Sequence, residues 1–181
     1  MAKLLLSLRQ VGVGLPLILL SFSKEVVAAD NLQLHGKLVA EPCIVQAGDG
    51  DIQLDFGAVI DKYLYLNKRT LGQVFELRLS DCDISIGKTV SVSFKGMEDP
   101  HSLGLLALSA NSEARGIAIG METVQGQALP INNSSEKFLL QNGKTVIGIR
   151  AYVQGESDAL INRSIVRGQF NATATFNLDY Q

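Results

Sequence analysis

The strongest constraint on the fold is the strict alternation of residue types over residues 168–181, at the end of the chain. Small or apolar side chains occupy the even positions from Gly168 to Tyr180, and polar side chains occupy the odd positions from Gln169 to Gln181. A period of two is typical of a β-strand with one buried face. We therefore expect a strand of about 13 residues, roughly twice the usual length, with small inward side chains in its middle.

The same period recurs along the rest of the chain and predicts further strands. They fall over residues 31–38, 51–56, 75–80, 90–95, 117–121 and 147–153. Turn signals rich in Gly, Asn and Asp separate them, which favours a single all-β sandwich. Of the 181 residues 46% are apolar and only 19% charged, enough apolar material for one core and too little charge for a disordered chain.

Residues 1–29 follow a different pattern. Lys3 and Arg9 give a positive start, residues 11–22 are mostly apolar, and residues 27–29 place small side chains before Asp30. This pattern predicts a secretory signal peptide. The alternative is a membrane anchor, but an apolar run of about 12 residues is shorter than the ~20 needed to span a bilayer. We expect cleavage before Asp30 and no stable membrane insertion of the mature chain.

Export would place Cys43 and Cys82 in an oxidising compartment, where a lone pair of cysteines is expected to form a disulfide. Two buried free thiols are the alternative. Two cysteines and two histidines exclude a four-cysteine zinc site, so we expect no metal and no cofactor. The net charge of −2 indicates no basic surface for nucleic acid.

Both ends of the mature chain therefore read as long alternating strands, and each needs a partner on its edges. The two strands could pair with each other within one chain, or each could pair with a different molecule. Composition and periodicity leave both arrangements open.

Several segments resemble the subunits of chaperone–usher fimbriae, in particular the minor subunits of type 1 and P pili. Residues 34–43 resemble the donor strand, with its Gly36, followed by the first disulfide cysteine, and residues 77–82 resemble the segment with the second. Further similarity lies over residues 90–96, 116–119 and 129–132. At the end of the chain, Tyr180 is penultimate and Gly168 precedes it in the position expected for chaperone recognition.

This resemblance implies an all-β fold, an incomplete immunoglobulin-like sandwich that lacks its final strand. A chaperone or a neighbouring subunit would lend the missing strand. The implied organisation is a signal peptide over residues 1–29, a donor-strand extension over 30–41 and a pilin domain over 42–181. The donor residues would be Leu32, Leu34, Gly36 and Leu38. The subunit's own groove, which the chaperone fills first, would carry Gly168, Phe170, Phe176, Leu178 and Tyr180.

The implied function is that of a structural subunit, of the minor or adaptor kind, that contributes to cell adhesion. Its partners would be a periplasmic chaperone, an outer-membrane usher and neighbouring subunits, in a homopolymer or a heteropolymer. It would pass through the periplasm to a fimbria at the cell surface. The alternatives are a complete secreted immunoglobulin-like binding module, a tip adhesin or a secreted hydrolase. Because no catalytic motif is present, we expect no enzyme.

Overall fold

The computed structural model describes residues 35, 36, 38, 40–46 and 48–181. The chain divides into two units, residues 1–38 and 39–181, and the second holds every strand and helix described here. Two of the expected donor residues, Leu32 and Leu34, lie outside the described residues. Gly36 and Leu38 are described; both are exposed.

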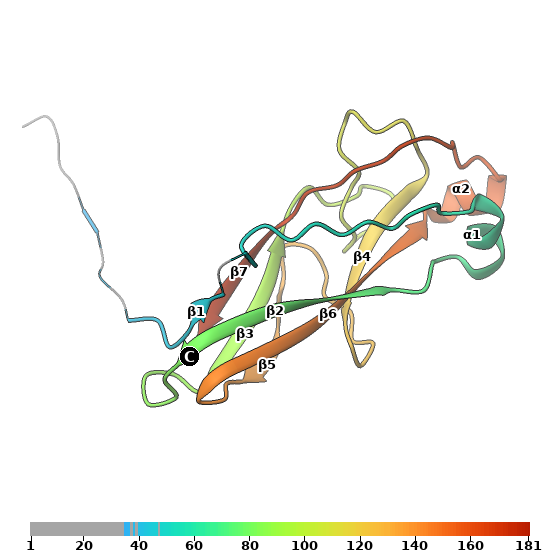
Figure 1. The fold of residues 1–181 in the computed structure, drawn as a ribbon. Coiled ribbons are helices and arrows are strands. Elements are labelled where there is room, and N and C mark those ends of the chain that lie inside the picture. Colours follow the sequence, from blue (N-terminus) through green and yellow to red (C-terminus); the bar gives the residue numbers. More distant parts are fainter. Residues whose placement is uncertain (1–34, 37, 39, 47) are drawn as a thin grey trace, which may run out of the picture. The chain divides into compact units, whose positions relative to one another are not determined.

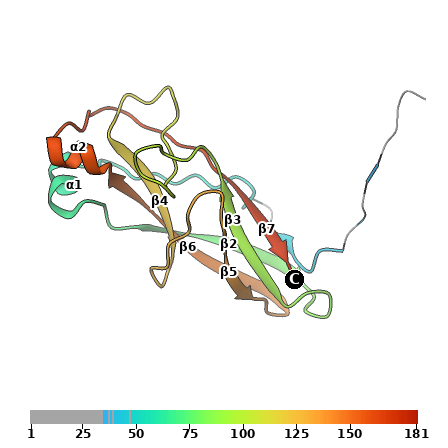
Figure 2. The ribbon, with the colours of Figure 1, turned by 180° about the vertical axis from the view of Figure 1, so that it is seen from behind.

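Residues 39–181 form two β-sheets. One sheet has the strand order β1-β2-β6-β4 and the other has the order β5-β3-β7 (Figures 1 and 2). The first consists of β1 (Ile44–Val45), β2 (Gln73–Cys82), β6 (Gly143–Gly155) and β4 (Ile117–Thr123); the second of β5 (Ser134–Leu139), β3 (Thr89–Lys95) and β7 (Thr175–Tyr180). All of these strand pairs are antiparallel.

The core lies between the two sheets and is built by the inward positions of the alternating strands. Leu77 and Leu79 of β2 and Ile147 and Ile149 of β6 come from one sheet, and Val90 and Val92 of β3 come from the other; all are buried. Cys43 and Cys82 form a disulfide that joins the chain just before β1 to the end of β2. The expected disulfide is therefore present.

Two short helices lie together at one end of the sheets (Figures 1 and 2). Helix α1 (Asp61–Asn67) is anchored by the buried side chain of Leu64 and ends at Lys68, which adopts a left-handed φ of 68°. Helix α2 (Ser157–Asn162) is anchored by Ala159 and ends at the left-handed Arg163. Among the described residues, no helix is long and apolar enough to cross a membrane.

Two of the expected strands differ in the structure. Residues 51–56 keep the predicted alternation of half-buried and exposed side chains but form no strand, and residues 168–174 also remain outside β7. The strand of about 13 residues is therefore regular only over Thr175–Tyr180, about the usual length of a strand. The physical reason is hydrogen bonding, because a segment without a strand on its edge has no ladder to join.

Candidate functional site: an open groove between two chain segments

A groove of about 1030 Å³ runs between two extended segments, residues 50–59, called the strap, and residues 168–176 of the C-terminal segment. Its walls and floor are largely apolar and come from both sheets. The strap contributes Ile52, Leu54, Phe56 and Val59; the C-terminal segment contributes Phe170, Ala172, Ala174 and Phe176; the floor contains Phe75, Phe94, Leu106, Ile119, Met121 and Ala151.

The inward side chains of both walls are packed against the core yet only half-buried. Residues such as Phe and Leu gain most when they are removed fully from water, so half-burial along a whole wall leaves stabilisation unrealised. The groove is therefore an unfinished part of the hydrophobic core rather than a cavity on its surface.

The C-terminal segment offers one backbone edge to the groove. Gln181 and Thr89 exchange backbone hydrogen bonds of 2.9 and 3.0 Å, which places the odd-numbered residues of β7 on the side of β3. Further up, Gln169 and Asn171 accept hydrogen bonds from Glu113 and Ser109 on the same side. Successive strand residues point their backbone N–H and C=O groups to opposite sides. The backbone N–H and C=O groups of the even-numbered residues from Phe170 to Tyr180 therefore point toward the groove.

The strap offers a second edge. Within the described residues, no backbone hydrogen bond joins residues 50–59 to another strand. Side-chain contacts hold the strap instead. At its start, the buried carboxylate of Asp49 accepts hydrogen bonds from Arg78 at 2.7 and 2.9 Å, and these bonds hold the pKa of Asp49 below its usual value.

Three contacts link the chain segments that carry the two walls, one between the walls themselves and one beyond each end of them. Beside α1, the Arg167 guanidinium donates hydrogen bonds of 2.7 and 2.9 Å to Asp61, which lower the pKa of that carboxyl. The rings of Phe56 and Phe170 lie 6.3 Å apart between centroids. At the opposite end, the Tyr180 hydroxyl donates to the Cys43 carbonyl at 3.4 Å, and burial raises the pKa of that hydroxyl. These contacts fix the spacing of the two open edges.

In the structure, the expected groove residues lie along the inward face of the C-terminal segment. Gly168, Phe170 and Phe176 line the groove. Leu178 and Tyr180 continue the same inward face and pack against the core, beyond the end of the cavity. Gly168 has a φ of 154°, and a Cβ there would lie 2.4 Å from that of Glu113, so this position requires glycine.

Sequence reasoning missed the opposite wall and the floor. The alternation of Ile52, Leu54 and Phe56 is visible in the sequence, but nothing in it tells which sheet this segment faces. Floor residues such as Met121 and Leu106 read as ordinary core positions. Within the described residues, no cluster of three or more metal-ligating side chains is present.

The comparisons with known proteins agree with this geometry. Residues 32–181 match the family described as fimbrial protein. The uncharacterised fimbrial-like protein YfcP of Escherichia coli K12 is 32% identical over 166 residues, which cover 90% of each chain. The fimbrial adapter PapK of Escherichia coli is 29% identical over 176 residues, which cover 94% of this chain and 98% of PapK.

The P pilus rod subunit PapA has a similar solved structure, with a TM-score of 0.67 and 23% identity. The match covers 78% of this chain and all of PapA. This likeness confirms the expected fold class, an incomplete immunoglobulin-like sandwich. Because the family match covers residues 32–181, the chain belongs to the fimbrial protein family.

Proposed function

We propose that the chain is a structural subunit of a chaperone–usher fimbria, of the minor or adaptor kind, and that its groove takes a donor strand from another protein. The observation that carries this proposal is the groove itself, which combines an unfinished apolar core with two open backbone edges. A complete immunoglobulin-like binding module would have this space filled by its own final strand.

An inserted strand would both complete the apolar core and pair with an open backbone edge. Its backbone would pair with the even-numbered residues from Phe170 to Tyr180, and its inward side chains would complete the core. This is recognition by strand addition, in which main-chain hydrogen bonds give affinity and alternate side chains give specificity. Three fully buried leucines would contribute about 5–9 kcal/mol, at roughly 1.5–3 kcal/mol each.

The inserted strand would run antiparallel to the C-terminal segment. Every strand pair of the two sheets is antiparallel, and this direction extends the β5-β3-β7 sheet without a change of pattern. The strand would then enter beside Tyr180 and leave beside Gly168, at the end that carries α1 and α2.

The chain also carries a segment suited to the donor role. Residues 30–41 would form the extension that follows the signal peptide of residues 1–29, and residues 42–181 would form the pilin domain. Leu32, Leu34 and Leu38 would fill a neighbour's groove, and Gly36 would face a point without space for a side chain. A subunit with both a groove and a donor segment can occupy an interior position in a fibre.

The remaining roles follow from membership of the family. PapK is named as a fimbrial adapter, which supports an adaptor or minor position for this chain. A periplasmic chaperone would fill the groove first, an outer-membrane usher would receive the complex, and the assembled fibre would lie at the cell surface. The chain would supply structure and adhesion rather than catalysis.

The test compares substitutions on the inward and the outward face of two segments, the proposed donor strand and β7. Leu34→Asp would place a charge in a neighbour's core, which is costly without a partner, so fibre incorporation should fail while chaperone binding persists. Gln33→Asp, on the opposite face, is the matched control and should assemble. Phe176→Asp should abolish chaperone capture, whereas Asn177→Asp should preserve it. If Leu34→Asp instead unfolded the chaperone-bound subunit, the segment would be an internal strand and the proposal would be wrong.

A further inference from the structure

Each end of the domain carries apolar side chains that are more than half exposed to solvent. At the helix end, Ile60, Leu66 and Leu71 are 64, 82 and 83% exposed. At the end that carries the disulfide, Ile44 and Ile86 are 62 and 51% exposed. The helices lie at one end of the sheets, and β1 and the C-terminus lie at the other (Figures 1 and 2). Ile60 and Leu71 line one pocket at the helix end, and contiguous exposed apolar surface marks interaction sites.

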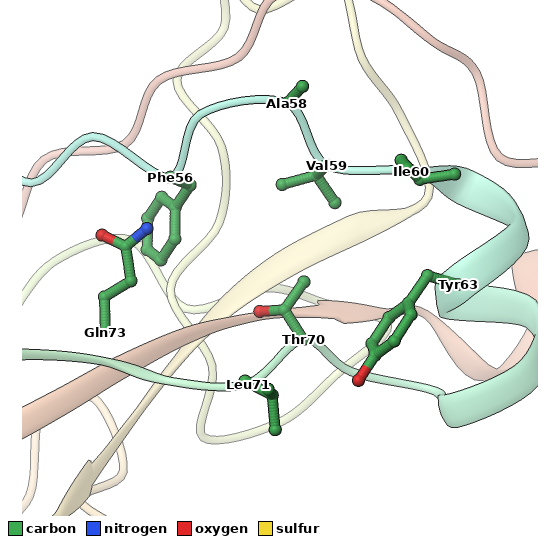
Figure 3. A pocket seen from close by; sticks show the side chains of 8 residues that line it. All are labelled: Phe56, Ala58, Val59, Ile60, Tyr63, Thr70, Leu71 and Gln73. Atoms are coloured by element: carbon green, nitrogen blue, oxygen red, sulfur yellow. The ribbon is translucent and has the colours of Figure 1, made fainter.

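The helix end also contains a receptive slot of about 220 Å³ beside the strap. Figure 3 shows Phe56 and Val59 of the strap on one side, Thr70 and Leu71 on the other, and Tyr63 of α1 at the end. The volume equals that of several water molecules at ~30 Å³ each, enough for one aliphatic side chain. Phe56 and Val59 line both the slot and the groove, so the two sites share a wall.

The disulfide end presents a loop, residues 83–88, beside the point where the N-terminal extension leaves the domain. The Asp83 N–H donates a 2.8 Å hydrogen bond to the carbonyl of Pro42. Pro42 also packs over Gly87, and a Cβ added at Gly87 would lie only 2.6 Å from the Cγ of Pro42. The exit of the extension and the loop that carries Ile84 and Ile86 are therefore in direct contact.

Chain length then brings the two ends of neighbouring subunits together. In a fibre, Leu38 of one subunit would lie in the groove of another, at the exit beside Gly168. Only residues 39–42 separate Leu38 from Cys43, and five extended steps reach at most about 18 Å. This short reach brings the loop of residues 83–88 into the neighbourhood of the next subunit's helix end.

Each end carries exposed charges opposite in sign to charges at the other end, although the loop also contains the exposed Lys88. Asp81 and Asp83 are exposed on or beside the loop, and hydrogen bonds from Ser85 lower the pKa of Asp83, which keeps it ionised. Lys62 and Lys68 are exposed at the helix end, and neither forms an ion pair within the described part of the chain. Lys62 and Leu66 are four residues apart in α1 and share one face of that helix.

We infer that the helix end is a docking surface for the disulfide end of a second copy of this chain, with Ile84 or Ile86 seated at the slot and Asp81 and Asp83 facing Lys62 and Lys68. The inference rests on the proposed function in its homopolymer form, because two copies meet only where the donor strand of one inserts into the groove of the other. It goes further by naming a contact between the bodies of adjacent subunits. The contact is heterologous, so it repeats along a fibre rather than closing a dimer.

The test uses polymers grown from the chaperone-bound chain alone, with a photo-crosslinking amino acid in place of Ile86. Native mass spectrometry first counts the strand-linked copies, and peptide mapping then locates the crosslinks. The expected attachment lies within residues 60–71 of the next copy. The control places the crosslinker at Val146, which is 57% exposed on the outer face of the first sheet. Its adducts should fall elsewhere.

Charge variants give a second readout. Lys62→Glu with Lys68→Glu should lower the crosslink yield at position 86 about two- to fivefold, the range expected for exposed ion pairs, without affecting strand insertion. Polymers that form but crosslink elsewhere would overturn the docking inference and leave the proposed function intact. A chain that accepts another subunit's donor strand but never its own would likewise overturn it. A groove that accepts no donor strand at all would overturn both.

Discussion

Phe56 and Phe170 bring their rings to 6.3 Å between centroids, although their backbone segments share no hydrogen bond within the described residues. One belongs to the strap and the other to the C-terminal segment, so this contact spans the open groove. The rings are tilted by 34° and remain half-buried. The packing of these two rings helps to hold the strap and the C-terminal segment together, as backbone hydrogen bonds hold neighbouring strands together elsewhere in the two sheets.

We expect Phe56→Ala and Phe170→Ala to be coupled. Each should destabilise the strand-complemented subunit by about 2–3 kcal/mol, less than the ~3–5 kcal/mol typical of a fully buried Phe. Together they should cost less than the sum, with a coupling of about 0.5–1.5 kcal/mol for an aromatic pair. Urea unfolding of the single and double variants measures this term. Phe138→Ala, in β5 away from the groove, is the control, and its effect should add to that of Phe170→Ala.

Gly168→Ala should loosen the start of the C-terminal segment. The backbone φ of 154° disfavours a side chain, and the new Cβ would meet Glu113, whose carboxylate accepts a hydrogen bond from the Gln169 N–H. We expect a loss of about 1–3 kcal/mol in stability, as for other strained positions. Faster hydrogen exchange at Gln169 would accompany it. Gly50→Ala, with open space around its Cβ, should behave as wild type; equal effects of both substitutions would contradict the steric argument.

Strands with a strongly alternating apolar face were predictable from the sequence, including β4 at the edge of its sheet. Phe75, Leu77 and Leu79 alternate with polar residues, and β2 forms there; the same holds for β3, β4 and β6. Helix α1 was missed because Tyr63, Leu64, Tyr65 and Leu66 carry no helical period. A single buried Leu64 anchors this helix.

The groove was only half predictable. Alternation shows which side chains of residues 168–181 face inward, because that depends on the chain alone. It cannot show that the strap lies opposite, since side-chain contacts between distant residues such as Asp61 and Arg167 hold it there. β5 was missed for a related reason, because its residues are mostly polar and exposed at the sheet edge.

The disulfide should contribute to stability and to the geometry of the groove. Replacing both Cys43 and Cys82 by Ser should lower the free energy of unfolding by about 2–4 kcal/mol. It should also weaken the contact between Tyr180 and the Cys43 carbonyl, which links the end of β7 to the chain just before β1. Thermal unfolding with and without a reductant measures the effect. The reductant should lower the stability of the wild type toward that of the variant and leave the variant unchanged.

Glu122 should make stability depend on pH in the acidic range. Burial alone raises the pKa of this carboxyl, but hydrogen bonds from Arg69 and Arg150 outweigh burial and lower the pKa below its ordinary value of 4.5. Arg69 is held in place as well, 4.2 Å above the ring of Tyr152. Because the folded-state pKa is the lower one, ionised Glu122 stabilises the fold above the unfolded-state pKa, and this contribution is lost as pH falls below about 4.5.

Glu122→Gln removes the charge while keeping the shape of the side chain. We expect it to cost about 1–3 kcal/mol near neutral pH, the usual cost of breaking hydrogen bonds to charged groups. The difference from wild type should shrink as pH falls below about 4.5, because the wild-type carboxyl binds a proton first in the unfolded chain and only at lower pH in the fold. Urea midpoints measured from neutral to acidic pH follow this difference. Glu76→Gln, at an exposed position of β2, is the control and should run parallel to wild type throughout. A stability difference between Glu122→Gln and wild type that stayed constant with pH would contradict this prediction. It would show that the contacts of Glu122 with Arg69 and Arg150 stabilise the fold equally well without the negative charge.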